Sequence, residues 1–279
     1  MNLFVTRVGT TFTLAVLVSL FGSTAYAAEP AAAPPAVPTA APPVERLFLS
    51  LAEDPALAQR QWWEGQFEYA DGSSNLPWDR QILRLQAAVA PWKNLEIGGR
   101  VGFGTTQAPQ GIPDGSGATD TDVYAKWNFG SFEHATFAAG GLLTVPTGDE
   151  SAGLGFDAFA VKIFGALRYP LAKAVFTGNV GVRFGDDGRL GDTSSATLDA
   201  KTSVSVGFGL IVPMASSWSL IGEAALETER FDGLDSDLRI LGGVNWRPSN
   251  RGVVRAAAGF GLSDVAPDIQ IIAGYAFTY

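Results

Sequence analysis

From residue 61 to the C-terminus, apolar and polar side chains alternate with a period of two, and this alternation constrains the fold more than any other feature of the sequence. The clearest example is the end of the chain, where Ile269, Ile271, Ala273, Tyr275 and Phe277 alternate with residues that are mostly smaller or more polar. Successive side chains of a β-strand point to opposite faces of the sheet. Each segment of this kind is therefore predicted to be a strand with two chemically different faces.

About twelve segments carry the pattern, and their length separates two all-β folds. The predicted strands are residues 61–69, 79–91, 94–105, 119–129, 132–146, 157–169, 173–185, 198–213, 216–229, 236–247, 252–262 and 267–279. A tilted strand needs about 9–11 residues to cross a bilayer, whereas strands of soluble proteins commonly have about 5–6. Most of these segments reach the longer value, which favours a membrane barrel over the alternative, a soluble β-sandwich.

The lengths of the connections between the predicted strands also favour a membrane barrel. Tight connections such as 130–131 and 214–215 alternate with long ones such as 107–118 and 186–197, as in bacterial outer-membrane barrels with short periplasmic turns and long external loops. An open sheet edge in hydrocarbon would leave N–H and C=O groups unpaired, at several kcal/mol each, so the sheet must close on itself. We therefore predict an all-β fold, a transmembrane antiparallel β-barrel of about 12 strands located in the bacterial outer membrane, multi-pass.

The N-terminal residues have a different composition and predict export. Residues 1–27 carry Arg7, an apolar stretch and the small-residue sequence Ala25-Tyr26-Ala27, which predicts a cleaved signal peptide rather than the alternative, a membrane anchor. Residues 28–60 begin as an Ala/Pro-rich linker. The predicted domains are thus the signal peptide, the linker over 28–60 and the barrel over 61–279.

An amphipathic stripe interrupts the linker and indicates a short helix over residues 44–57. Val44, Leu47, Phe48 and Leu51 recur at helical spacing. Two placements are open for it, a plug inside the barrel or a marginal helix on the periplasmic side, and we favour the second.

Composition excludes several classes of chemistry. The chain has no cysteine, one histidine and a formal net charge of -9. Those counts disfavour thiolate metal sites, cysteine nucleophiles and His-based catalysis. The excess of acidic residues disfavours nucleic-acid binding. Pairs such as Asp149-Glu150 offer oxygen ligands for divalent cations, but a solvated loop surface is the favoured interpretation. We expect no enzyme activity, no cofactor and no resident metal.

One internal region resembles a known family. The run from Thr119 to Trp127, followed by Gly141-Leu142-Leu143-Thr144-Val145-Pro146-Thr147-Gly148-Asp149-Glu150 and Gly153-Leu154-Gly155, resembles the outer-membrane channel family associated with meta-cleavage phenol-degradation pathways. The resemblance covers mainly residues 118–185. It implies an outer-membrane barrel that helps small aromatic or other organic solutes across; the Ala/Pro linker and the helix at 44–57 have no counterpart in it.

Charged residues on the polar strand faces are the candidate lumen-lining residues. They are Arg80, Arg84, Glu96, Arg100, Asp122, Lys126, Lys162, Arg168, Arg183, Lys201, Glu223, Glu227, Arg239 and Arg255. Basic residues outnumber acidic ones, which favours anions if water fills the lumen; the alternative is that the charges pair across strands and fill it. The terminal aromatic residues Tyr275, Phe277 and Tyr279 are a candidate assembly signal.

Two functions from different classes remain. The first is a passive channel for small organic solutes, aromatic or anionic compounds among them. The second is a closed structural or interaction barrel whose acidic loops serve adhesion or envelope integrity. Expected partners are the lipid bilayer with lipopolysaccharide, the outer-membrane assembly machinery and a small-molecule solute.

Overall fold

A computed structural model of the chain describes residues 45–50, 52–58, 61–73, 76, 78–108, 114–189 and 197–278. The predicted signal peptide, the linker up to Val44 and the last residue, Tyr279, lie outside these ranges. Among the described residues, no helix is long and apolar enough to cross a membrane.

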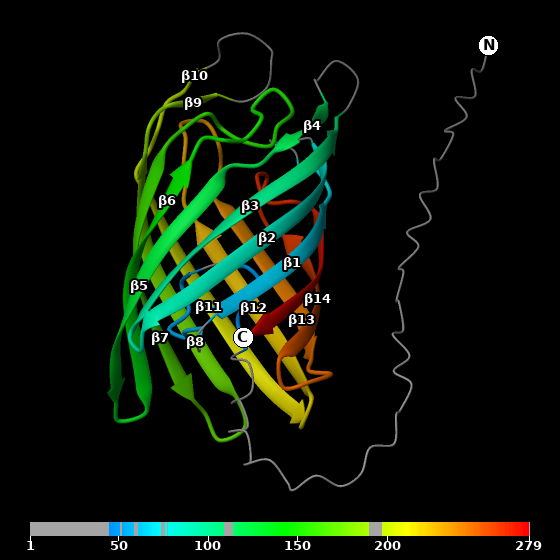
Figure 1. Cartoon of the computed structure of the whole chain (residues 1–279). Helices are drawn as coiled ribbons and strands as arrows, with labels where there is room; N and C mark the ends of the chain where they lie inside the picture. Colours follow the sequence, from blue (N-terminus) through cyan, green and yellow to red (C-terminus); the bar gives the residue numbers. More distant parts are fainter. Residues whose placement is uncertain are drawn as a thin grey trace, which may run out of the picture. The chain divides into compact units, whose positions relative to one another are not determined.

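The predicted barrel is confirmed: long antiparallel strands form a closed 12-strand barrel (Figure 1). The strands are β1 (Gln61–Ala70), β2 (Asp79–Trp92), β3 (Leu95–Gln107), β5 (Thr121–Phe132), β6 (Ala135–Val145), β7 (Ala160–Pro170), β8 (Val175–Gly185), β11 (Ser203–Ala215), β12 (Trp218–Glu227), β13 (Asp237–Trp246), β14 (Gly252–Gly261) and β15 (Ile269–Thr278). Each pairs with its neighbour in the chain, and β1 closes the barrel by pairing with β15. No strand edge of the barrel is therefore left unpaired, as the hydrocarbon phase requires.

Tight turns and long connections lie at opposite ends of the barrel (Figure 1). The β2–β3 and β5–β6 pairs are joined by two residues each, Lys93-Asn94 and Glu133-His134. Three short strands occur in the long connections: β4 (Gly115–Ala118) pairs with β3, and β9 (Gly188–Arg189) pairs with β10 (Thr197–Leu198). Outer-membrane barrels place short turns in the periplasm, so we call the long-connection end the external end.

The two faces of the wall differ as the alternation predicts. Outward side chains such as Leu85, Phe129 and Trp92 are large, apolar and exposed. Inward residues such as Lys126 and Glu96 are polar and buried. A charge facing lipid at the bilayer midplane costs about 2–4 kcal/mol, which explains why charged residues of the strands take the inward positions. At the turn end, Trp218 and Trp246 stack with their ring centroids 5.7 Å apart.

Residues 45–50 and 52–58 lie inside the barrel and are not helical, so the prediction of a helix over 44–57 is wrong in its described part. Their backbone N–H and C=O groups bond to side chains of the barrel wall instead of to one another: Glu223 accepts from Phe48 and Leu49, and Arg255 donates to the carbonyl groups of Arg46 and Leu47. The favoured periplasmic placement is also wrong, because Leu47 and Phe48 pack in a buried cluster with wall residues.

Candidate functional site: the barrel lumen

The segment 45–58, called here the luminal segment, is held at both ends by one carboxylate of β3. Glu96 accepts hydrogen bonds from Arg46 at 3.0 and 2.5 Å near the start of the segment, and from the backbone N–H of Ala58 at its end. On the wall, Tyr124 donates to Glu96 at 2.7 Å and Lys126 forms an ion pair with it at 3.3 Å. Glu96 and Lys126 are almost fully buried, so this carboxylate is compensated by two cations and one hydroxyl.

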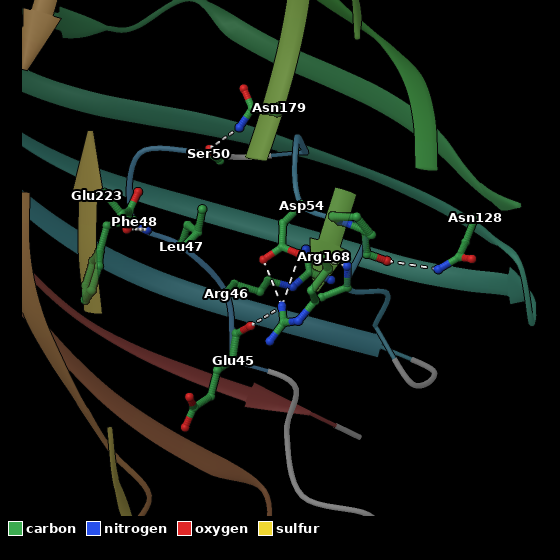
Figure 2. A network of polar contacts seen from close by, with 12 residues as sticks. Glu45, Arg46, Leu47, Phe48, Ser50, Asp54, Asn128, Arg168, Asn179 and Glu223 are labelled. Carbon is green, nitrogen blue, oxygen red and sulfur yellow. Dashed lines mark hydrogen bonds and ion pairs between the residues drawn. The ribbon is translucent and has the colours of Figure 1, made fainter. Parts of the chain in front are cut away.

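The middle of the luminal segment supplies two acidic partners to basic residues of the wall. Glu53 pairs with Lys162 at 2.6 Å. Figure 2 shows the second contact, in which Asp54 accepts from Arg168 at 3.0 and 3.1 Å. Lys126 also donates to the carbonyl oxygens of Asp54 and Ala56, each at 2.6 Å. A buried charge needs such partners because desolvation without them costs several kcal/mol.

The start of the segment combines polar contacts with apolar packing. The Glu223 carboxylate accepts from the N–H groups of Phe48 and Leu49 at 2.5 and 2.9 Å (Figure 2). The guanidinium of Arg255 lies 4.3 Å from the ring centroid of Phe48 and pairs with Glu64 at 2.6 Å. The wall residues that hold the segment lie mostly near the turn end of their strands, so the segment fills that half of the lumen.

A cavity of about 250 Å³ lies beside the luminal segment and is lined by Phe48, Leu49, Ser50 and Glu53 of the segment together with the barrel wall. Four ion pairs of the wall contribute to its lining: Arg84 with Glu68, Arg100 with Asp122, Arg183 with Glu227 and Arg239 with Asp237. Three of these pairs join neighbouring or nearby strands, and the fourth joins two residues of β13. Charges of the lumen wall thus pair with one another, as one of the two predictions for the lumen expected.

A second cavity, of about 170 Å³, lies between the wall and the β6–β7 connection. It shares Arg84, Arg100, Asp122, Arg183 and Arg230 with the first cavity and adds Arg80 and Phe156, among other residues. The polar space of the lumen is therefore concentrated toward the external end.

The structure places most of the predicted lumen residues on inward strand positions and brings them into contact. Lys201 is the exception, and its assignment to the lumen is wrong. Because β11 begins only at Ser203, Lys201 belongs to the preceding loop, where it pairs with Glu229 at 2.5 Å and Asp232 at 2.7 Å. These two hydrogen-bonded carboxylates raise the pKa of Lys201.

Of the candidate assembly signal, Tyr275 and Phe277 lie on the outer face of β15 with exposed side chains, and Tyr279 lies outside the described residues. The acidic residues of the luminal segment, Glu45, Glu53 and Asp54, were not among the predicted lumen residues. The signal that pointed to them was the excess of basic residues on the lumen face, since buried cations require counter-charges.

Comparisons with known proteins agree with this architecture. No protein-family model and no curated protein sequence matches the chain. Among solved structures, the COG4313 outer membrane channel from Pseudomonas putida F1 is similar with a TM-score of 0.66 at 16% identity, over 84% of this chain and 100% of that one. The KdgM porin, also solved in complex with disordered oligogalacturonate, is similar with a TM-score of 0.54, at 8–9% identity, over 78% of this chain and 99% of that one. The chain therefore has the outer-membrane β-barrel fold that this channel and this porin share.

Proposed function

We propose that the protein is a passive outer-membrane channel for small organic solutes, in which the luminal segment restricts the pore. The observation that carries the proposal is the combination of an apolar outer wall with a charged lumen that keeps a cavity of about 250 Å³ next to a segment held by polar contacts. Polar contacts can be exchanged for water when a segment moves, whereas a lumen closed by apolar packing alone offers solutes no path.

The number of strands limits the solutes. A barrel of this size is narrower than the 16–18-stranded porins that keep a wide aqueous channel, and the luminal segment narrows it further. We therefore expect passage of small molecules only, with aromatic and anionic compounds among them. The suggested connection to phenol degradation rests on the sequence resemblance and belongs to this proposal.

A second candidate function has its own support in the contacts of the luminal segment. Arg46, Glu53 and Asp54 are all buried and ion-paired with the wall. If these contacts never open, the protein is a closed barrel whose acidic loops interact with other envelope components.

Planar-bilayer recording separates the two functions. We compare the full chain with the double variant Glu53→Gln/Asp54→Asn, which removes the charges that pair with Lys162 and Arg168. The channel proposal expects discrete conductance steps, with larger or longer openings in the variant. Glu227→Gln serves as the control, because Glu227 bonds to Arg183 and Ser203 of the wall.

The outcomes are distinct. Conductance in the parent that rises in the double variant but not in the control supports a channel restricted by the segment. No conductance from either protein, while both migrate as folded barrels in heat-modifiability gels, would favour the closed barrel.

We also propose how the chain reaches its membrane. Residues 1–27 are removed during export as a signal peptide, and the aromatic residues Tyr275, Phe277 and Tyr279 direct the last strand to the outer-membrane assembly machinery. Lipopolysaccharide would surround the external end of the barrel.

A further inference from the structure

Two arginines near the external end lack a direct ion-pair partner in the described part of the chain, although carboxylates lie in their surroundings. Arg80 lies at the start of β2, and Arg230 lies in the β12–β13 connection. Neither forms an ion pair with a described residue, and the buried Nε of Arg230 has no hydrogen-bond partner there. Their neighbours Arg84, Arg100 and Arg183 differ, since each is paired with a carboxylate of the wall.

Both arginines line the cavity of about 170 Å³, whose charge balance is positive. Five arginines (80, 84, 100, 183 and 230) and two aspartates (120 and 122) contribute to its lining. Asp122 already accepts from Arg100 and Thr144, and Asp120 accepts from the backbone N–H groups of Gly148 and Phe156. The two carboxylates make these other hydrogen bonds and offset the five arginines only in part, so the lining keeps a net positive charge.

The electrostatics of Arg230 agree with this balance. Burial and the neighbouring cation Arg183 lower the pKa of Arg230, and the carboxylates of Glu227, Asp122 and Asp120 offset only part of this lowering. An anion placed next to this guanidinium would relieve both effects further, because it supplies a direct counter-charge and the acceptor that Nε lacks.

Apolar side chains complete the surroundings of the two arginines. The guanidinium of Arg230 lies 5.2 Å from the ring centroid of Phe156 and 5.8 Å from that of Phe231. Arg80, Phe156 and Arg230 together line both this cavity and a smaller one of about 110 Å³, to which Phe231, Leu234 and Val265 also contribute. Asp235, Asp237 and Arg239 also line the smaller cavity. A ligand bound between Arg80, Arg230 and Phe156 therefore meets guanidinium groups on one side and hydrocarbon on the other.

We propose that Arg80, Arg230 and Phe156, called here the mouth site, bind a small monocarboxylate with an apolar body before it enters the lumen. The inference rests on the proposed channel function and names one class of solute for it. A cavity of about 150 Å³ accommodates one benzene molecule, so the space available matches a carboxylate of about the size of benzoate. Larger anions and anions without an apolar part fit the mouth site less well.

Isothermal titration calorimetry on the full chain, folded in detergent, tests the mouth site with benzoate as the probe. We expect one site, at least tenfold weaker binding of benzyl alcohol, which lacks the charge, and at least tenfold weaker binding of acetate, which lacks the ring. Arg80→Gln and Arg230→Gln should each weaken benzoate binding at least tenfold. Arg189→Gln is the matched control, because Arg189 is an exposed loop arginine with only a long contact to Asp157.

Several results would overturn the proposal: no benzoate binding to the parent protein, equal binding of benzyl alcohol, tighter binding of inorganic phosphate than of benzoate, or an equal loss in Arg189→Gln. The comparison of probes uses the parent protein alone, so it decides the question even if an arginine variant does not fold. Calorimetry measures binding without ion flow, so the two proposals can fail separately. A protein that conducts but does not bind benzoate contradicts only the mouth site. A protein that binds benzoate but does not conduct contradicts only the channel.

Discussion

Replacing Glu96 by Gln should release the luminal segment from the barrel. This carboxylate contacts Arg46 at the start of the segment and Ala58 at its end, and it is fully buried together with its partners. Glutamine keeps the shape of the side chain but removes the charge that compensates Arg46. The bidentate contact with the guanidinium is then lost while Arg46 stays buried.

The size of the effect follows from the burial of the ion pair. Removing one partner of a buried ion pair costs about 3–5 kcal/mol, because the remaining charge stays desolvated. When the segment leaves the lumen, Arg46 becomes hydrated and this cost disappears. The substitution therefore destabilises mainly the state in which the segment is inserted. Since about 1.4 kcal/mol corresponds to a factor of ten in an equilibrium constant, the ratio of released to inserted segment should rise about 100-fold or more.

Thiol labelling measures that ratio directly. The chain contains no cysteine, so Ala52→Cys introduces a unique thiol at a position with 0% exposure in the lumen. A hydrophilic maleimide should label this thiol slowly in the parent background and at least tenfold faster with Glu96→Gln. Openings in planar bilayers should become more frequent in the same variant.

The matched control is Glu227→Gln, which removes a lumen carboxylate that bonds to Arg183 and Ser203 of the wall. It should leave the labelling of residue 52 unchanged. If Glu96→Gln folds, as judged by heat-modifiable migration, and its labelling rate stays within twofold of the parent rate, the assigned role of Glu96 in holding the segment is wrong.

Three further predictions concern topology, assembly and packing. Single cysteines at Lys93, Ser131, Ala172, Ala215 and Ser249 should be protected from an impermeant label in intact cells, whereas those at Gly115, Asp187 and Asp232 should react. The reverse labelling pattern would mean that the long connections face the periplasm. Deleting Tyr279 should leave unfolded protein in the periplasm, and normal heat-modifiable folding of the deletion would refute a terminal assembly signal. Gly98→Ala should lower the stability of the folded barrel by about 1–3 kcal/mol, measured as a lower urea midpoint. The reason is that the added Cβ would lie 2.5 Å from the hydroxyl of Tyr124 and 2.6 Å from the carbonyl oxygen of Ala87. An unchanged midpoint would show that Tyr124 moves aside freely.

The barrel could be predicted from the sequence because each strand separates two solvents. Lipid selects large apolar residues on one face and the lumen selects small or polar residues on the other, so side-chain alternation alone assigns strand and face. The assignment failed where the alternation was extended beyond the strand. Lys201 has the same parity as Ser203 and Ser205 of β11, but it precedes the first paired residue and turns to loop carboxylates instead.

The conformation of the luminal segment could not be predicted in the same way. Leu47 and Phe48 were recognised as apolar positions of one face, and both do pack against the wall. The stripe resembled a helix because sequence spacing reports only local periodicity. The groups that determine the backbone are Glu223 and Arg255, which lie about 175 and 208 residues away in the chain, and no local pattern reveals them.

The position of the counter-charges changes how selectivity should arise. Sequence alone suggested excess positive charge along the lumen wall, with Arg100 and Lys126 among its sources. In the structure, Asp122 compensates Arg100, and Lys126 is bound by Glu96 and by carbonyl oxygens of the luminal segment. Opposite charges a few ångströms apart produce little potential beyond about 8–10 Å at ordinary salt. Within the lumen, the positive charge without a direct ion-pair partner is therefore concentrated at Arg80 and Arg230, so the external end, rather than the wall at the middle of the barrel, should decide whether an anion enters.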